Sequence, residues 1–309
     1  MRARCLLPFV AFAVACSREP VQQPAVATVS LADPHTGHAM TEMSGAAVAD
    51  PMSAMQGTAG IPAGAADAAA RLGASTRHGE WVKIAWDAGS ADSLMAGVVY
   101  PETKKKAHVV VVIHEIFGLS TWVRGVADQL AADGFIAVAP DLLSRVRGGP
   151  SADELKSDSA TKLIRTVNVA EMNKGVFAAA QYGLSLPAAK KKYGVVGYCW
   201  GGSATFNHAV FNGKHFGGGV VYYGTSAAKD SMPRIQAPVL GLYGGNDARV
   251  NATIGWADTT MKALKKKYDF KVFDGAGHGF LRAQDQPANL EAARQAWPMT
   301  IAFFKKNLK

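Results

Sequence analysis

Cysteine is scarce in this sequence, with only three among 309 residues. Cys5 and Cys16 lie at the N-terminus, so the rest of the chain contains Cys199 alone. A single cysteine cannot form a disulfide within its own domain, and the fold must therefore be stabilised by its hydrophobic core. The spacing of cysteine and histidine residues in the globular part also matches no zinc site, so we expect no metal there.

Clustered positive charge is also missing, although the net charge is +9. Three short lysine runs are each expected beside a strand, namely Lys104–Lys106, Lys190–Lys192 and Lys265–Lys267. Such runs are typical of solvated loops and edges, and no motif that reads a nucleic-acid groove is present. We therefore expect no nucleic-acid partner. A content of 49% hydrophobic and 18% charged residues suits one or two globular domains with a large core.

The first apolar run is too short to span a bilayer. Met1–Arg4 is basic, and Cys5–Ala15 is an apolar segment of the length found in signal peptides. We therefore expect residues 1–16 to be a signal peptide and the protein to be exported to the periplasm or cell envelope. The segment ends in Ala13-Val14-Ala15-Cys16, which is similar to a bacterial lipobox. Either Cys16 is lipidated and anchors the protein, or cleavage after Ala15 gives a soluble periplasmic protein.

Bulky apolar residues are almost absent from residues 17–75, which are rich in Ala, Pro, Gly, Met and Ser. Such a segment buries too little apolar surface to offset its ordering entropy, so we expect a flexible tether. It contains a loose group of soft ligands that would suit copper(I), namely His35, His38, Met40, Met43, Met52 and Met55. The alternative is a low-complexity linker that happens to contain methionine.

Residues 76–309 are expected to form one globular domain in which apolar strands alternate with helices. The expected strands are Trp81–Trp86, Leu94–Tyr100, Ala107–Ile113, Phe135–Pro140, the run from Tyr193 towards Cys199, Gly218–Tyr223, Val239–Tyr243 and Phe270–Phe273. The expected helices are Thr121–Ala132, Ala170–Gly183, Ser203–Val210, Thr253–Lys267 and Leu290–Asn307. This order predicts an α/β fold, with a mainly parallel central sheet covered by helices on both faces and two opening strands that are antiparallel.

Cys199 lies in Gly197-Tyr198-Cys199-Trp200-Gly201-Gly202, between a predicted strand and a predicted helix. This pattern is a nucleophile elbow, in which glycines on both sides of the nucleophile allow a sharp turn that exposes its side chain above the sheet. A catalytic thiol is one interpretation. The other is a small buried core residue, since free cysteine is often buried.

Further reactive side chains follow other strands, at the sheet edge where parallel sheets gather their chemistry. Glu115 follows the strand that ends at Ile113, Asp247 follows Tyr243, and His278 follows Phe273. The order nucleophile, acid, histidine is that of a hydrolase triad, which predicts that Cys199, Asp247 and His278 act together. The alternatives are that Asp247 caps a turn and that His278 is an ordinary histidine.

These residues make the sequence similar to the dienelactone hydrolase family of the α/β-hydrolase superfamily. The resemblance covers about Trp81 to Leu308 and rests on the following motifs: His114–Gly118, Pro140–Leu142, Gly197–Gly202, Tyr222–Gly224, Gly244–Asp247 and Gly277–Phe280. It implies an α/β-hydrolase fold with a catalytic Cys199, Asp247 and His278. It also implies that Glu115 lies beside the thiol and that Arg282 binds a substrate carboxylate. Tyr223 is expected to contact the substrate.

The expected reaction is cleavage of a small, anionic ester or lactone through an acyl-cysteine intermediate. His278 would take the thiol proton, Asp247 would orient the imidazole, and the N–H groups of Ile116 and Trp200 would bind the oxyanion. This chemistry needs no cofactor and is compatible with a monomer. One alternative is a broad envelope esterase or thioesterase, and another is a tethered metal-handling binding lipoprotein with a relic hydrolase domain.

Overall fold

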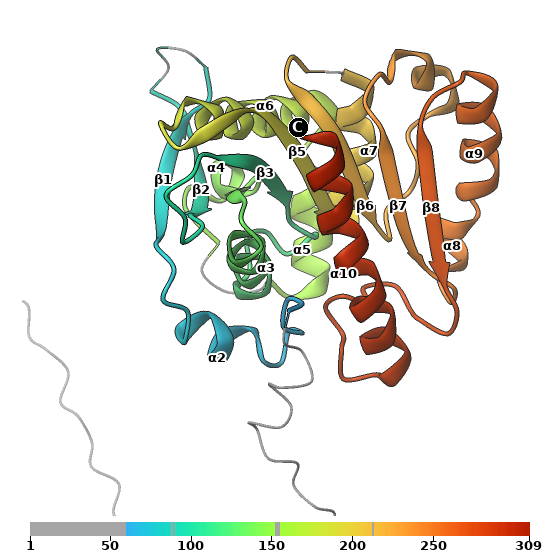
Figure 1. Ribbon diagram of the computed structural model, residues 1–309, viewed down its shortest axis with the longest axis horizontal. Coiled ribbons are helices and arrows are strands. Elements are labelled where there is room, and N and C mark those ends of the chain that lie inside the picture. Colours follow the sequence, from blue (N-terminus) through green and yellow to red (C-terminus); the bar gives the residue numbers. More distant parts are fainter. Residues whose placement is uncertain (1–59, 88, 90, 152–154, 212) are drawn as a thin grey trace, which may run out of the picture. The chain divides into compact units, whose positions relative to one another are not determined.

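Strands and helices alternate along most of the chain, as the sequence predicts (Figure 1). The computed structural model describes residues 60–87, 89, 91–151, 155–211 and 213–309. The strands are β1 Gly79–Ala85, β2 Ser93–Val99, β3 Ala107–Ile113, β4 Ile136–Pro140, β5 Ala189–Tyr198, β6 Phe216–Tyr222, β7 Val239–Gly244 and β8 Tyr268–Phe273. The helices are α2 Ala68–Gly73, α3 Thr121–Ala132, α4 Ser144–Arg147, α5 Ser157–Ile164, α6 Val169–Ser185, α7 Trp200–Phe211, the 3-10 helix η1 Lys229–Arg234, α8 Ala248–Asn251, α9 Ile254–Ala263 and α10 Pro287–Asn307.

The described strands form one eight-stranded sheet in the order β1-β2-β4-β3-β5-β6-β7-β8. β1 pairs with β2 and β2 with β4 in antiparallel fashion, whereas every pair from β4 to β8 is parallel. The expectation of two antiparallel opening strands followed by a parallel sheet is therefore confirmed. β1 and β8 are the edges of this sheet.

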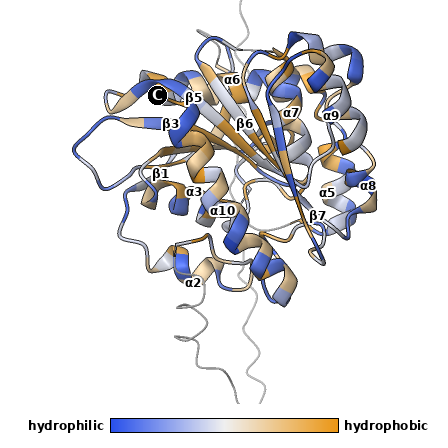
Figure 2. Ribbon diagram, turned by 45° about the vertical axis from the view of Figure 1, so that its right-hand side comes forward, coloured by the Kyte–Doolittle hydropathy of each residue, from blue (hydrophilic) through white to orange (hydrophobic). Residues whose placement is uncertain are grey.

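Two hydrophobic clusters cover the two faces of the sheet. One lies under α6, α7 and α9, and the other lies under α3 and α10, which packs against β6 and β7. β3 and β4 are buried on both faces, which explains why their sequences are continuously apolar instead of alternating. Figure 2 shows the same layering, with hydrophobic central strands between helices that carry hydrophilic residues outward.

One of the three lysine runs lies within a strand. Lys190–Lys192 was expected beside a strand, as a solvated loop or edge, and it belongs to β5 itself, which begins at Ala189. All three lysines are exposed at the start of that strand, before its buried part begins at Tyr193. They lie in an irregular stretch of the strand, between the pairs Ala107–Ala189 and Val109–Tyr193, where the register shifts.

The segment that packs on the globular domain begins earlier than residue 76. From residue 60 to 75, which we expected to belong to the tether, the chain packs on the globular domain: the Ala65 N–H donates to the Arg282 carbonyl at 2.8 Å, and the Gln284 amide donates to the Pro62 carbonyl at 2.9 Å. The indole N–H of Trp122 donates to the Ala63 carbonyl at 3.1 Å. We call residues 61–66 the strap. It is held mainly by backbone groups, and a hydrophobic pattern in the sequence does not reveal such contacts.

The expectations for the remaining N-terminal residues lie outside the described part of the chain. They concern the signal peptide, Cys16, the tether up to residue 59 and the His and Met group. Within the described part, no helix is both long enough and apolar enough to cross a bilayer. No three His, Cys, Asp or Glu side chains come together as a metal site among these same residues.

Candidate active site

Cys199 stands in a strained turn between β5 and α7. Its φ of 57° lies in the left-handed region, which side-chain-bearing residues rarely adopt. A Cβ on Gly197 would collide with the carbonyl of Gly201, and a Cβ on Gly201 would collide with the carbonyls of Ile113 and His114. The glycines on both sides are therefore a steric requirement, as the sequence predicts for an elbow.

The elbow opens into a cavity of about 250 Å³ at the carboxyl ends of the parallel strands. Its described lining includes Glu115, Ile116, Cys199, His278 and Arg282, which come from three separate loops. Sequence reasoning expected each of these residues at one site. The structure brings them together because β3, β5 and β8 run parallel, so their carboxyl ends lie at the same end of the sheet.

The Cys199 thiol is partly buried, and its pKa is raised to about 11. Burial is the main cause, and the nearby Glu115 carboxylate adds to it because a second negative charge would be repelled. The backbone N–H of Trp200 and the cation of Arg249 act in the opposite direction. At neutral pH the resting side chain is therefore a protonated thiol.

His278 and Asp247 form the second element of the site. The distance between His278 Nδ1 and Asp247 Oδ2 is 2.5 Å, and the Asp247 side chain is buried whereas about a third of His278 is exposed. Asp247 also accepts a hydrogen bond from the Val250 N–H, because it caps helix α8. Capping and orienting the histidine are thus both true of Asp247. With Nδ1 donating to Asp247, Nε2 of His278 is left to act as a base.

Glu115 and Arg282 form the charged pair of the cavity. Arg282 Nε lies 3.4 Å from Glu115 Oε2, and the guanidinium carbon lies 5.2 Å from the centre of the Phe117 ring. The Glu115 side chain is almost fully buried, so the arginine compensates a carboxylate that water reaches poorly. The cavity therefore contains one cation that a substrate carboxylate could share.

Tyr223 is expected from the sequence to contact the substrate. In the structure it is fully buried and is not among the described residues that line the cavity. Its ring meets the edge of the His278 ring at a centroid distance of 5.2 Å. Tyr223 directly follows β6 with a φ of 39°, and its ring belongs to the hydrophobic cluster on that face of the sheet. Tyr223 therefore packs against the His278 ring from the buried side.

His114 is a residue of the site region to which the sequence analysis assigned no role. The ring is fully buried, accepts a hydrogen bond from the Leu142 N–H at Nε2 and donates from Nδ1 to the Glu115 carbonyl. It also stacks on the Trp200 ring at 5.8 Å. His114 thus joins the loops that carry Glu115 and Trp200. The sequence signal for it was its place directly before Glu115 at the end of a strand.

Comparisons with known proteins agree with this architecture. The model of the dienelactone hydrolase family matches residues 95–308. A protein of Methylorubrum extorquens named "Putative carboxymethylenebutenolidase" is 30% identical over 209 residues, which are 64% of this chain and 71% of that protein. One of the same name from Saccharolobus solfataricus is 28% identical over 258 residues, covering 72% of this chain and 98% of that protein.

Solved structures show the fold. A Klebsiella pneumoniae protein whose structure is titled "Putative Dienelactone Hydrolase" aligns with a TM-score of 0.65 at 24% identity, over 75% of this chain and 100% of that one. The sheet order, the elbow and this likeness define an α/β-hydrolase fold. The chain belongs to the dienelactone hydrolase family. It is therefore a dienelactone hydrolase-like hydrolase.

Proposed function

We propose that this protein hydrolyses a small, anionic ester or lactone through an acyl intermediate on Cys199. The observation that carries the proposal is the shared cavity of Cys199 and His278, with Asp247 2.5 Å behind the imidazole. A strained elbow, a base and an orienting carboxylate are the parts that covalent acyl transfer requires. Cys199, His278 and Asp247 are thus the proposed catalytic residues.

The proposed reaction begins with transfer of the thiol proton to Nε2 of His278. The thiolate attacks the substrate carbonyl, and the oxyanion that forms accepts hydrogen bonds from the N–H groups of Ile116 and Trp200. Collapse of this intermediate breaks the ester bond, and the leaving oxygen takes the proton from His278. A water molecule, deprotonated by His278, then attacks the thioester and releases the acid and the thiol.

Glu115 keeps the resting thiol unreactive in this proposal. Its carboxylate contributes to the raised pKa of Cys199, so a thiolate forms only when that carboxylate is neutralised or moves away from the sulfur. Arg282 is the proposed partner of the substrate carboxylate, since it lines the cavity and already binds an anion there. An anionic substrate would therefore compete with Glu115 for Arg282, and the thiol is released from its inhibition when the displaced carboxylate moves away from the sulfur.

The decisive experiment is rapid-quench mass spectrometry of the enzyme with a slowly hydrolysed aryl ester. We expect an acyl adduct on Cys199, and we expect Cys199→Ala to remain folded without turnover. Ser203→Ala is the matched control, because Ser203 is the hydroxyl nearest in sequence that could replace the thiol as nucleophile. Full activity of the Cys199→Ala variant would refute the acyl-cysteine mechanism. A parallel panel of lactones, neutral esters and thioesters separates the anionic preference from a broad esterase or thioesterase activity.

We also propose that the protein is exported and that Cys16 is lipidated. The support is the basic N-terminus, the short apolar segment and the lipobox-like Ala13–Cys16. Cys16→Ala should release active protein from the membrane fraction into the soluble periplasmic fraction. A wild-type protein that is soluble, begins after Ala15 and carries no lipid would contradict the anchor.

A further inference from the structure

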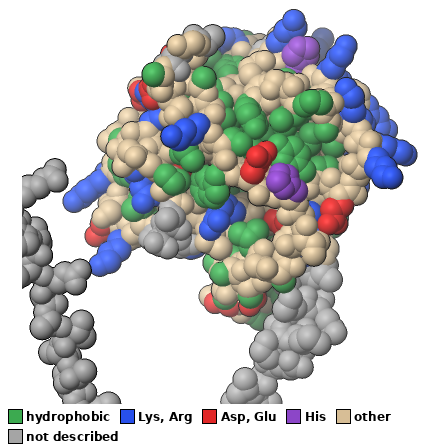
Figure 3. Space-filling model, turned by 90° about the vertical axis from the view of Figure 1, so that its left-hand side faces the viewer, with side chains coloured by type: hydrophobic (Ala, Val, Ile, Leu, Met, Phe, Trp, Pro, Cys, Tyr) green, Lys and Arg blue, Asp and Glu red, His purple; other side chains and the backbone are tan. Residues whose placement is uncertain are grey.

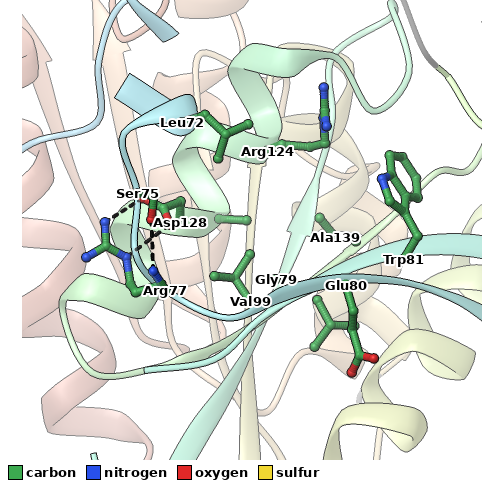
Figure 4. A pocket seen from close by; sticks show the side chains of 13 residues that line it. Leu72, Ser75, Arg77, Gly79, Glu80, Trp81, Val99, Arg124, Asp128 and Ala139 are labelled. Atoms are coloured by element: carbon green, nitrogen blue, oxygen red, sulfur yellow. Dashed lines mark hydrogen bonds and ion pairs between the residues drawn. The ribbon is translucent and has the colours of Figure 1, made fainter. Parts of the chain in front are cut away.

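A second cavity lies away from the catalytic one, between helices α2 and α3 and the β1 edge of the sheet (Figure 4). Its volume is about 240 Å³, and its described lining residues include none that line the Cys199 cavity. On this side of the molecule hydrophobic side chains gather at the surface (Figure 3), and the indole of Trp81 is 40% exposed. The proposed function uses no part of this cavity.

Small residues create the space. Trp81, Gly97 and Ala139 lie directly opposite one another on β1, β2 and β4, so all three face α3. A Cβ added at Gly97 would only touch a methyl group of Leu119 at 3.6 Å, which is ordinary contact. Nothing in the packing therefore requires glycine at position 97. The missing side chain leaves an apolar floor beside the tryptophan.

The polar groups around the floor leave one cation in need of a partner. Asp128 is neutralised by Arg77, through bonds of 3.0 and 2.6 Å, and it also accepts a hydrogen bond from Ser75 (Figure 4). On the opposite side, Arg124 donates from Nη2 to Thr121 at 3.0 Å. Its Nε is buried and has no hydrogen-bond partner among the described residues. A buried donor of a cationic group that lacks an acceptor is costly.

Glu80, the other acid in the cavity lining, does not pair with Arg124. Glu80 alternates with Trp81 along β1, so its side chain points to the other face of the sheet. There it accepts a hydrogen bond from the Tyr100 hydroxyl at 2.7 Å. The guanidinium carbon of Arg124 lies 5.7 Å from the centre of the Trp81 ring. A cation, an aromatic wall and an apolar floor are therefore contiguous.

We propose that this cavity is a binding site for a small organic anion with a flat apolar body, such as an aromatic carboxylate. The body would cover Gly97 and Ala139 beside the Trp81 ring, and the anionic group would pair with the accessible end of the Arg124 guanidinium. Ligand sites commonly combine a largely apolar lining with a few polar groups that fix orientation. Leu72 of α2 and the following Ser75 line one side of the cavity.

The test is isothermal titration of the full protein with 2-naphthoate, and with 2-naphthalenemethanol as the neutral counterpart. Arg124→Gln should weaken naphthoate binding about tenfold or more, the lower end of what a hydrogen bond to a charged group supplies. It should leave binding of the neutral alcohol unchanged. Gly97→Val fills the floor and should abolish binding of both probes. Arg234→Gln, at an exposed arginine of η1, is the matched control and should bind as wild type does.

The catalytic cavity also contains an arginine, so Arg282→Gln is a necessary further variant. Loss of naphthoate binding in Arg282→Gln but not in Arg124→Gln would place the anion in the catalytic cavity and overturn the proposal. Equal binding of naphthoate to wild type and Arg124→Gln would overturn it as well. Circular dichroism of each variant separates loss of binding from loss of folding. The outcome does not depend on the acyl-cysteine mechanism, because no turnover is measured.

Discussion

The two cavities have nearly equal volumes but hold their charges in different ways. In the Cys199 cavity His278 is bonded to Asp247 and Arg282 lies beside Glu115, so each of these charged groups has a partner. In the cavity beside Trp81, Arg77 and Asp128 neutralise each other, but the Nε of Arg124 has no hydrogen-bond acceptor among the described residues. Removing one member of an ion pair leaves the other as a buried charge without a partner, which costs free energy. Removing Arg124 leaves no unpaired charge behind.

The comparison predicts the largest losses for the paired groups of the catalytic cavity. Asp247→Asn should lower kcat by on the order of 10³–10⁴, because the amide cannot hold His278 in the required tautomer. Steady-state hydrolysis of an aryl ester measures this effect, and thermal unfolding checks that the variant is folded. A loss below tenfold would mean that Asp247 serves only as the cap of α8.

A smaller and more selective loss is expected for Arg282→Ala. For a lactone that carries a carboxylate, kcat/KM should fall roughly 10- to 150-fold, the effect of losing a hydrogen bond to a charged group. A neutral ester of similar shape should be affected little. Equal losses on the two substrates would show that Arg282 does not read the substrate charge.

Glu115→Gln should make the thiol more acidic. Burial of Cys199 remains, but the repulsion from the carboxylate disappears, so the pKa of the thiol should fall below about 11. Each unit of this fall raises the thiolate fraction at pH 8 about tenfold. The rate of alkylation by iodoacetamide as a function of pH measures the shift. Asp269→Asn, at an exposed acid of β8, is the control, and an unchanged profile in Glu115→Gln would contradict the assigned cause.

The smallest effect is expected at the strap. A Cβ at Gly64 would approach Gln284 Cβ at 3.1 Å and the Arg282 carbonyl at 3.2 Å, whereas a Cβ at Gly73 would meet nothing within 4 Å. Gly64→Val should therefore displace the Arg282 backbone and raise KM for an anionic ester by about threefold, which is below 1 kcal/mol. Gly73→Val should not. If both variants behave alike, the strap does not position Arg282.

Much of the fold could be read from the sequence because the relevant signals are local. The continuous apolar runs of β3 and β4 and the helix between them fix the parallel sheet. The glycines around Cys199 specify the elbow, because backbone carbonyls leave no room for a Cβ. The joint position of Cys199, Glu115 and His278 then follows from the common edge at which their strands end.

What the sequence did not reveal depends on contacts between distant segments. The strap is held by carbonyls and amides, which every residue possesses, so its composition resembled a tether. Tyr223 follows a strand as the site residues do, but its side chain is fully buried in the hydrophobic cluster. The second cavity arises because Trp81, Gly97 and Ala139 are aligned across three strands. The sequence of one strand does not determine its register against its neighbours.

The strap also determines how the domain would bear a mechanical load. Force applied to the N-terminal side of residue 60 reaches the domain through residues 61–66, whose hydrogen bonds include those at Ala65 and Gln284. These bonds are few and lie outside the sheet, so they would break before any strand pair. The bonds of the Pro62 carbonyl with Gln284 and of the Ala63 carbonyl with Trp122 would bear such a pull first, and the bond of the Ala65 N–H with the Arg282 carbonyl would follow. In a stretched molecule, the tension would act on the loop that carries Arg282 while the elbow at Cys199 remained intact.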